Sequence, residues 1–306
     1  MFHVVVLGAA AGGGVPQWNC GCRVCQAART SHPELQSTQA SLAVSADGRH
    51  WFLINASPDL RQQLIRAPQL HPAAGKLRHS PISGVILTNG EIDAITGLLS
   101  MREGWPFTIY AHPKVLATLN ANSVFNVLSE KNVKRRPIAI DEPFEPALPD
   151  GSPSGIEILP FEVTGKSAWY LEGERQSDRA GDTLGLRIRE KATDKFFYFL
   201  AACAEITEDL KSRLKGAPLV FFDGTVWRDN EMILAGLSTK TGQSMGHISM
   251  SGERGVIAAL ESLGIGRKIF LHINNSNPVW LHDSAERKAA ERAGWQIPAD
   301  GMEIVL

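Results

Sequence analysis

The pattern of apolar runs and polar breaks predicts mainly strands in the first half of the chain and strand–helix units in the second half. Short apolar runs between glycine, proline or small polar residues are typical of buried strands, and apolar residues at helical spacing are typical of helices. The predicted strands are 3–8, 40–45, 50–55, 107–111, 156–164, 183–190, 195–200, 219–222, 268–272 and 302–306. The predicted helices are 113–122, 206–214, 252–262, 284–293 and a short helix after residue 58. No repeat or linker divides the chain, so the pattern predicts a single α/β domain over residues 1–306.

The stretch 84–104 is the element around which the rest of the prediction is organised. A buried strand at its start and an apolar helical stripe at its end enclose Asn89, Glu91 and Asp93, which stand at every second position. In an extended turn this spacing places the three side chains on one side. Two interpretations stay open: ordinary turn residues with Asp93 as a helix N-cap, or a turn that presents oxygen ligands.

A cluster of cysteines is the strongest local signal for metal. Cys20, Cys22 and Cys25 lie close together, whereas Cys203 stands apart and is expected to be a small buried hydrophobic residue. Thiolates at this spacing can surround one side of a tetrahedral ion, and zinc favours sulfur ligands. Three ligands leave a fourth position for a distant residue or for water. The alternative, three reduced surface cysteines, is less favoured.

Three further loops follow apolar strands, where sheet-based folds usually carry their sites. Their polar residues are Asp223, His247 and His272. Asp223 also suits a cap of the next turn, His247 suits a ligand, a proton donor or a structural role, and His272 alone suits a structural role. Residues 165–182 are polar and glycine-bearing, and they are expected to form a flexible lid.

The totals exclude several classes of function. A net charge of −1 gives little attraction for nucleic acid, so no nucleic-acid partner is expected. No run of about 20 apolar residues occurs, so no membrane span is expected. The apolar N-terminus lacks a basic region typical of a secretory signal, and a cytoplasmic location is expected. The glycines at 12–14 lack the G-x-G-x-x-G spacing of a dinucleotide-binding turn.

Taken together, these segments resemble the PqqB family of pyrroloquinoline quinone (PQQ) biosynthesis proteins, which belongs to the metallo-β-lactamase superfamily. The segments that carry the resemblance are MFHVVVLGAAAGGGVPQWNCGC, NASPDLRQQL, LTNGEIDAITGLLSMREG, GDTLGL, FFDGTVW, SMGHISMSG and HINNSNPVW. The resemblance implies an α/β, metallo-β-lactamase-like αββα four-layer sandwich. It also implies a site at one edge of two packed sheets.

The superfamily's metal signature is incomplete in this sequence. Its H-x-H-x-D-H motif falls on residues 89–94, where Asp93 is kept and the last position is Ala94. The slot for a bridging carboxylate falls on 199–203, which contains none. The superfamily's late metal-binding histidine corresponds to His272, and the fourth ligand of the cysteine zinc site corresponds to Asn275.

The resemblance implies chemistry other than hydrolysis. A dizinc hydrolase needs a bridging water activated by both metals, and the ligands for that centre are missing. The remaining set of Asp93, His272 and Glu91, with His247 or Asn89, suits Fe²⁺ and dioxygen. The implied role is an iron-dependent oxygenase that hydroxylates the tyrosine moiety of a Glu-Tyr-derived PQQ precursor. Asp93 and His272 would hold iron, Glu91 would be a ligand or proton acceptor, and His247 would position the substrate phenol or shuttle a proton.

A binding protein is the alternative from another functional class. The degraded ligand set and Ala94 favour a carrier of PQQ or its precursor that assists transport to the periplasm. The carboxylates of PQQ are suited to arginine side chains or to the backbone N–H groups of the glycine loops. A residual hydrolase is a weaker third interpretation, and the sequence leaves a homodimer open.

Overall fold

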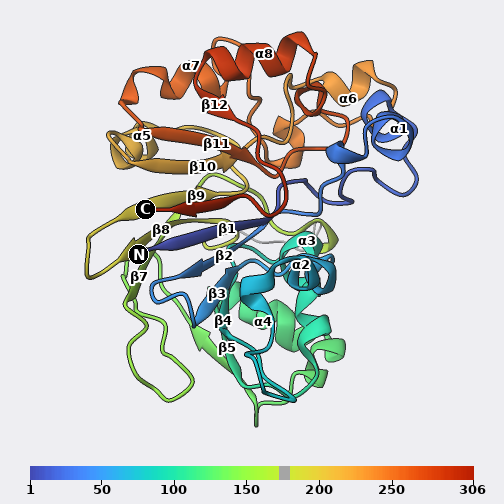
Figure 1. Ribbon diagram of the computed structural model, residues 1–306. Coiled ribbons are helices and arrows are strands. Elements are labelled where there is room, and N and C mark those ends of the chain that lie inside the picture. The colour runs from blue at the N-terminus through green and yellow to red at the C-terminus, as the bar shows by residue number, and fades with distance from the viewer. Residues whose placement is uncertain (172–179) are drawn as a thin grey trace.

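Two β-sheets lie face to face in the computed structural model, with helices on both outer faces (Figure 1). The structure describes residues 1–171 and 180–306. Helices α2 (Leu60–Arg66), α3 (Ile92–Ile95) and α4 (Pro113–Ala121) cover one sheet. Helices α5 (Glu208–Leu214), α7 (Val256–Leu260) and α8 (Ala285–Arg292) cover the other. This order of layers confirms the expected αββα sandwich.

The first sheet has the strand order β13-β1-β2-β3-β4-β5-β6 within the described residues. Its strands are β13 (Glu303–Val305), β1 (His3–Gly8), β2 (Ser41–Ser45), β3 (Trp51–Ile54), β4 (Ile82–Ile86), β5 (Phe107–Ala111) and β6 (Val133–Pro137). Pairing is antiparallel from β13 to β3 and parallel from β3 to β6. The pairing of β1 with β13 joins the two ends of the chain in one sheet.

The second sheet has the strand order β12-β11-β10-β9-β8-β7. Its strands are β12 (Trp295–Gln296), β11 (Arg267–Leu271), β10 (Leu219–Asp223), β9 (Phe196–Leu200), β8 (Leu184–Glu190) and β7 (Ile156–Glu162). Strands β9 to β12 are parallel, whereas β7, β8 and β9 pair antiparallel. The parallel strands point their carboxyl ends toward the same edge, and loops at that edge carry the candidate site.

Burial of both faces explains why the strands read as continuous apolar runs. In β1, Val4 and Val6 pack in the core that includes the second sheet, whereas Val5 and Leu7 pack in the core beneath α2, α3 and α4. Successive side chains of a strand point to opposite faces, so one strand contributes to both cores.

Several sequence predictions need correction. Helix α3 has Glu91 rather than Asp93 at its N-cap, so the prediction of an Asp93 cap is wrong. The predicted helix 252–262 is shorter, because its first residues form turns before α7. Strands β6 and β12 and helix α1 (Arg23–Thr30) were not predicted. The predicted lid, 165–182, lies partly outside the described residues, and a single domain over the whole chain stays a prediction.

No helix in residues 1–171 and 180–306 combines the length and apolar character needed to cross a bilayer.

Candidate metal centre

Loops from both sheets bring the candidate site residues together. Asp223 is the last residue of β10, and His272 directly follows the neighbouring parallel strand β11. Asp93 comes from α3, which follows β4 in the other sheet. Because parallel strands end at one edge, side chains that are distant in sequence meet there.

The central contact is between Asp93 and His272. The His272 Nε2 and Asp93 Oδ2 atoms are 2.8 Å apart. Burial alone would lower the pKa of His272, but the hydrogen bond and charge of Asp93 outweigh it and raise that pKa. Burial would raise the pKa of Asp93, but its hydrogen bond and charge interaction with His272 lower it. These opposite shifts describe a partly buried ion pair, in which the side chains of His272 and Asp93 are 15% and 19% exposed.

The backbone of His272 adopts an uncommon conformation. Its φ of 54° lies in the left-handed region, which is unfavourable for a residue with a β-carbon. The neighbouring Ile273 holds this bend through hydrogen bonds between its backbone and those of Ala9 and Ala11. The glycine-bearing N-terminal loop therefore supports the turn that aims the imidazole at Asp93.

A second imidazole lies beside the first. The rings of His247 and His272 stack with centroids 5.1 Å apart and an interplanar angle of 18°. His247 Nδ1 is 2.7 Å from the Oδ2 atom of Asp223, whose side chain is fully buried. One ligand atom from each of Asp223, His247 and His272 lies within 4.8 Å of the others, and this set forms a candidate metal cluster in the described residues.

Glu91 and Asn89 lie in the same turn as Asp93, but a side-chain oxygen of each accepts a hydrogen bond from a backbone N–H group. Glu91 Oε1 accepts from the backbone N–H of Trp169 at 3.0 Å, and Asn89 Oδ1 accepts from the backbone N–H of Glu91 at 2.9 Å. Burial and the negative charge of Asp93 raise the pKa of Glu91. Glu91 is therefore electrostatically linked to the ion pair, while Asn89 acts mainly on the shape of the turn.

The cysteine cluster forms a second, separate candidate site. The sulfurs of Cys20, Cys22 and Cys25 lie within 4.8 Å of one another. Cys20 and Cys25 are buried, so the alternative of three surface cysteines is wrong. Cys22 caps the N-terminus of α1, where its sulfur accepts from the Cys25 N–H. Burial raises the pKa of the Cys22 thiol to about 12, whereas hydrogen bonds from Cys22 outweigh burial and lower the pKa of Cys20.

Asn275 lies against this cluster, as the sequence predicted for a distant partner. Its Nδ2 atom is 3.2 Å from the Cys25 sulfur and 3.8 Å from the Cys22 sulfur. An amide nitrogen donates hydrogen bonds and offers no lone pair to a metal. The side-chain amide must therefore rotate to present Oδ1 before Asn275 can act as a ligand.

Thr225 was given no role in the sequence analysis, and Asp223 was placed in a loop expected to carry a site, with a cap of the next turn as its alternative role. Asp223 does accept from the Thr225 N–H at 3.0 Å, but it also binds His247. The Thr225 hydroxyl lies 2.9 Å from His272 Nδ1 and 2.6 Å from Asp223 Oδ1. The available signal was the Asp-Gly-Thr sequence at the end of an apolar strand. Cys203 is fully buried, as predicted.

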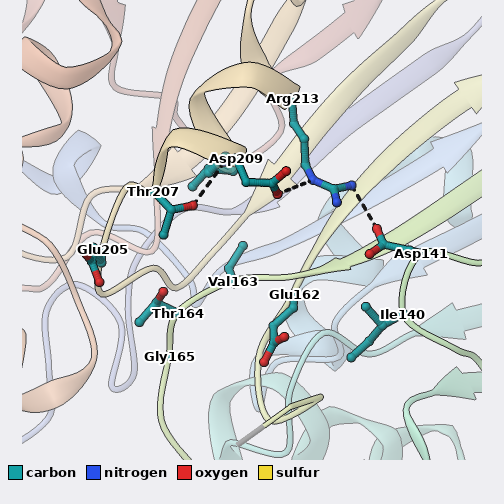
Figure 2. Close-up of a pocket in the computed structure, with 11 residues that line it drawn as sticks. Ile140, Asp141, Glu162, Val163, Thr164, Gly165, Glu205, Thr207, Asp209 and Arg213 are labelled. Atoms are coloured by element: carbon teal, nitrogen blue, oxygen red, sulfur yellow. Dashed lines mark hydrogen bonds and ion pairs between the residues drawn. The ribbon is translucent and has the colours of Figure 1, made fainter.

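A cavity of about 400 Å³ lies between the ends of β7 and α5 and is lined by different residues (Figure 2). Its charged lining includes Asp141, Glu162, Glu205 and Arg213, and Arg213 pairs with Asp141 at 2.9 Å. Neither Asp93 nor the imidazole pair lines this cavity. The cavity is therefore distinct from the candidate metal centre.

Comparisons with known proteins support the resemblance inferred from the sequence. Residues 50–273 match the beta-lactamase superfamily domain. A coenzyme PQQ synthesis protein B from Bradyrhizobium diazoefficiens is 70% identical, and the match covers 100% of both chains. The crystal structure of Zn²⁺-bound PqqB from Methylobacterium extorquens has a TM-score of 0.93 and 48% identity, covering 99% of this chain and 100% of that one.

A more distant solved structure shares the fold alone. A diphosphatase from the PhnP family has a TM-score of 0.68 and 20% identity, covering 100% of this chain and 98% of that chain. Family membership is established by the full-length matches of high identity. The chain therefore belongs to the coenzyme PQQ synthesis protein B family, and its fold is that of the beta-lactamase superfamily.

Proposed function

We propose that this protein acts in PQQ biosynthesis as an iron-dependent oxygenase that hydroxylates the tyrosine moiety of a Glu-Tyr-derived precursor. The observation that carries the proposal is the 2.8 Å contact between Asp93 Oδ2 and His272 Nε2, with His247 stacked beside it. A carboxylate with one or two imidazoles and open positions is a donor set suited to Fe²⁺.

The residues present fit such a metal. Asp93 and His272 now share a hydrogen bond, and a cation can take the place of the shared proton because both atoms are potential ligands. His247 uses Nδ1 toward Asp223, which leaves its Nε2 for the site. When bound, iron would supply activation of dioxygen. Glu91 is a candidate ligand or proton acceptor, and Asn89 is a weaker candidate ligand.

Residues on two sides of the turn shape the surroundings of Glu91 and Asp93. The 3-10 turn Trp169–Leu171 contacts the turn from the outside, since the Trp169 N–H binds Glu91 and the Tyr170 hydroxyl binds the Gly90 carbonyl. Burial raises the pKa of Tyr170 to about 12, so this phenol keeps its proton at neutral pH. On the other side, a Cβ atom at Gly12 would lie 3.4 Å from Asp93 Oδ2. The glycine therefore leaves room beside the carboxylate.

The proton chemistry in this proposal belongs to two side chains. Hydroxylation of a phenol ring requires a group that accepts and returns a proton near the ring. Glu91 is suited to that role because burial and the negative charge of Asp93 raise its pKa above the ordinary value and so make it a better proton acceptor. His247 is suited to orient the phenol oxygen through Nε2, because Asp223 occupies its other nitrogen.

We further propose that Cys20, Cys22 and Cys25 hold a structural zinc, with Asn275 as the fourth ligand through its amide oxygen. A zinc-bound relative supports the choice of metal. The site would join the N-terminal loop to the loop after β11, which also carries His272. Zinc would thus stabilise the position of the active-site loop without taking part in the reaction.

The experiment that tests the oxygenase is a reaction of protein loaded with Fe²⁺ under anaerobic conditions. Oxygen and a Glu-Tyr-containing precursor are then added, and products are analysed by mass spectrometry. We expect a product that has gained oxygen on the tyrosine ring, and no such product with Asp93→Asn. The proposal fails if the wild-type protein forms no oxygenated product while a family member with histidine at the position of Ala94 does.

A carrier of PQQ or its precursor, assisting transport to the periplasm, is the second candidate. It is favoured by Ala94, which is buried in the apolar core beneath the helices, and by the absence of a carboxylate in residues 199–203. A carrier should bind PQQ tightly without metal and consume no oxygen. Binding measured by fluorescence quenching, in the presence and absence of chelator, separates the two functions.

A further inference from the structure

A fully buried carboxylate lies behind the two histidines, and four hydrogen-bond donors surround it. Asp223 Oδ2 accepts from the Cys203 N–H at 3.0 Å and faces His247 Nδ1 at 2.7 Å. Asp223 Oδ1 accepts from the Thr225 N–H at 3.0 Å and from the Thr225 hydroxyl at 2.6 Å. An ionised carboxylate only accepts hydrogen bonds, so each of these four neighbours directs a hydrogen toward it.

This arrangement fixes the proton on His247. Because Asp223 accepts from the ring, the neutral form of His247 carries its hydrogen on Nδ1. Thr225 Oγ1 also lies 3.0 Å from the same nitrogen, but the charged and nearer carboxylate is the stronger acceptor. The lone pair of His247 is therefore on Nε2.

The same reasoning extends through Thr225 to His272. A hydroxyl has one hydrogen, and the shortest hydrogen bond of Thr225 donates it to Asp223. The backbone carbonyl of His272, at 3.0 Å, is a weaker competitor because it is neutral. Toward His272 Nδ1, at 2.9 Å, the hydroxyl oxygen can then act only as an acceptor. Nδ1 of His272 therefore carries a hydrogen, while its Nε2 faces Asp93 Oδ2 at 2.8 Å and donates a second hydrogen there until a metal takes the place of that hydrogen.

We propose that Asp223 and Thr225 are positioning residues that keep a hydrogen on Nδ1 of both imidazoles, so that Nε2 is the atom through which each ring would bind a metal. The inference rests on the proposed function in one respect: the Nε2 atoms then face a metal held by Asp93. Neither positioning residue needs to touch that metal. The stacked geometry of the rings, 18° from parallel, is consistent with two ligands aimed from one wall.

The test compares Thr225→Val with Thr225→Ser. Valine has nearly the shape of threonine but cannot accept the hydrogen bond, whereas serine keeps the hydroxyl. In metal-free protein, ¹⁵N–¹H correlations of the imidazole rings report which nitrogens carry a hydrogen. We expect an Nδ1–H signal of His272 in wild type and Thr225→Ser, and its loss in Thr225→Val, where the Nδ1–H group has no acceptor.

Affinity for Co²⁺, measured by titration, is the second readout. Loss of a hydrogen bond behind a metal-binding histidine typically weakens metal binding about 10–100-fold, and we expect this for Thr225→Val with recovery in Thr225→Ser. Thr108→Val is the matched control, because Thr108 lies near the start of β5, away from the carboxyl ends of the strands that carry the site. This variant should leave the affinity for Co²⁺ unchanged. Comparable thermal unfolding of the variants shows that they are folded.

Two results would overturn the inference. One is an Nδ1–H signal of His272 that persists in Thr225→Val with unchanged Co²⁺ affinity. The other is a His272 Nδ1 without a hydrogen in the wild-type protein. The Nδ1–H readout needs neither metal nor oxygen, so failure of the oxygenase together with the expected Nδ1–H signals would reject only the proposed function.

Discussion

At the scale of single residues, Glu231 shows how burial controls a charge near the site. This carboxylate accepts from the N–H groups of Trp227 and Arg228 and contacts Ser276. Burial outweighs these hydrogen bonds and raises its pKa to about 7. The unfolded carboxyl ionises at lower pH than the folded one, so the folded state binds more protons between about pH 4.5 and 7. Stability should therefore fall as pH rises through that window.

Glu231→Gln is expected to remove this pH dependence. Glutamine keeps an acceptor oxygen for the two backbone donors but cannot ionise. Relative to wild type, the variant should gain stability on the order of 1–3 kcal/mol at pH 8 and little at pH 4. Urea unfolding at several pH values measures the difference. Glu253→Gln, an exposed position, is the control for loss of a charge, and parallel curves for wild type and Glu231→Gln would contradict the assignment.

Single residues also show where sequence reasoning was sufficient. Asp93 and His272 could be selected from the motif and the end of a strand, and the structure brings them into contact. The role of Thr225 could not be predicted, because it depends on which atoms of Asp223, His247 and His272 face one hydroxyl. Such geometry is set by the register of adjacent strands, which residue type and spacing do not specify.

At the scale of elements, the turn that carries Asp93 is held by close backbone packing. A Cβ atom at Gly97 would lie 2.0 Å from the Ser57 carbonyl oxygen, whereas at Gly90 the nearest atom would be 3.7 Å away. Gly97→Ala must displace backbone and should cost about 3 kcal/mol of stability, the upper end for overpacking. Gly90→Ala, in the same segment, should cost much less. Denaturant unfolding compares the two, and equal losses would contradict this packing.

The cysteine loop is a second element whose integrity should depend on metal. Cys25→Ser is expected to release zinc and to lower the melting temperature, because the sulfur cluster links α1 to the loop of Asn275. Zinc release is measured with a chromogenic chelator. Cys203→Ala is the matched control, since this buried thiol lies outside the cluster. Full zinc content in Cys25→Ser would refute the proposed site.

The elements differ in how well their patterns predicted them. Strands buried on both faces gave clear apolar runs, as in β10 and β11. Strand β6 has the sequence VKRRP and mostly exposed side chains, so its polar composition concealed it. Helix α1 is only eight residues long, and its start depends on the cap by Cys22, which was interpreted only as a metal ligand. Edge strands and capped helices are stabilised by residues outside their own sequence, so their own hydrophobic pattern does not reveal them.

At the scale of the whole molecule, the two ends of the chain pair as neighbouring strands in one sheet. Ile304 of β13 pairs with Val4 and is 4% exposed, while the adjacent Val305 is 53% exposed. Ile304→Ala should lower the free energy of unfolding by about 2 kcal/mol or more. Val305→Ala should change it by less than about 0.5 kcal/mol. Urea unfolding followed by circular dichroism tests the pair, and similar losses would show that β13 contributes little.

The overall architecture could be predicted because motif order and spacing identified the family, and the four layers followed from it. Composition and periodicity alone predicted only that the fold is of the α/β class. Function was harder to predict, because it depends on whether Asp93, His272 and His247 together hold a metal. The motif does not answer this question, because metal ligands are missing at Ala94 and in residues 199–203.

Iron content after anaerobic loading and desalting is the most direct test of a metal between Asp93 and His272. Wild-type protein should retain stoichiometric Fe²⁺ together with zinc, and His272→Ala and Asp93→Asn should lose the iron while retaining the zinc. Unchanged iron content in both variants, or no iron in the wild-type protein, would contradict a metal site formed by Asp93 and His272.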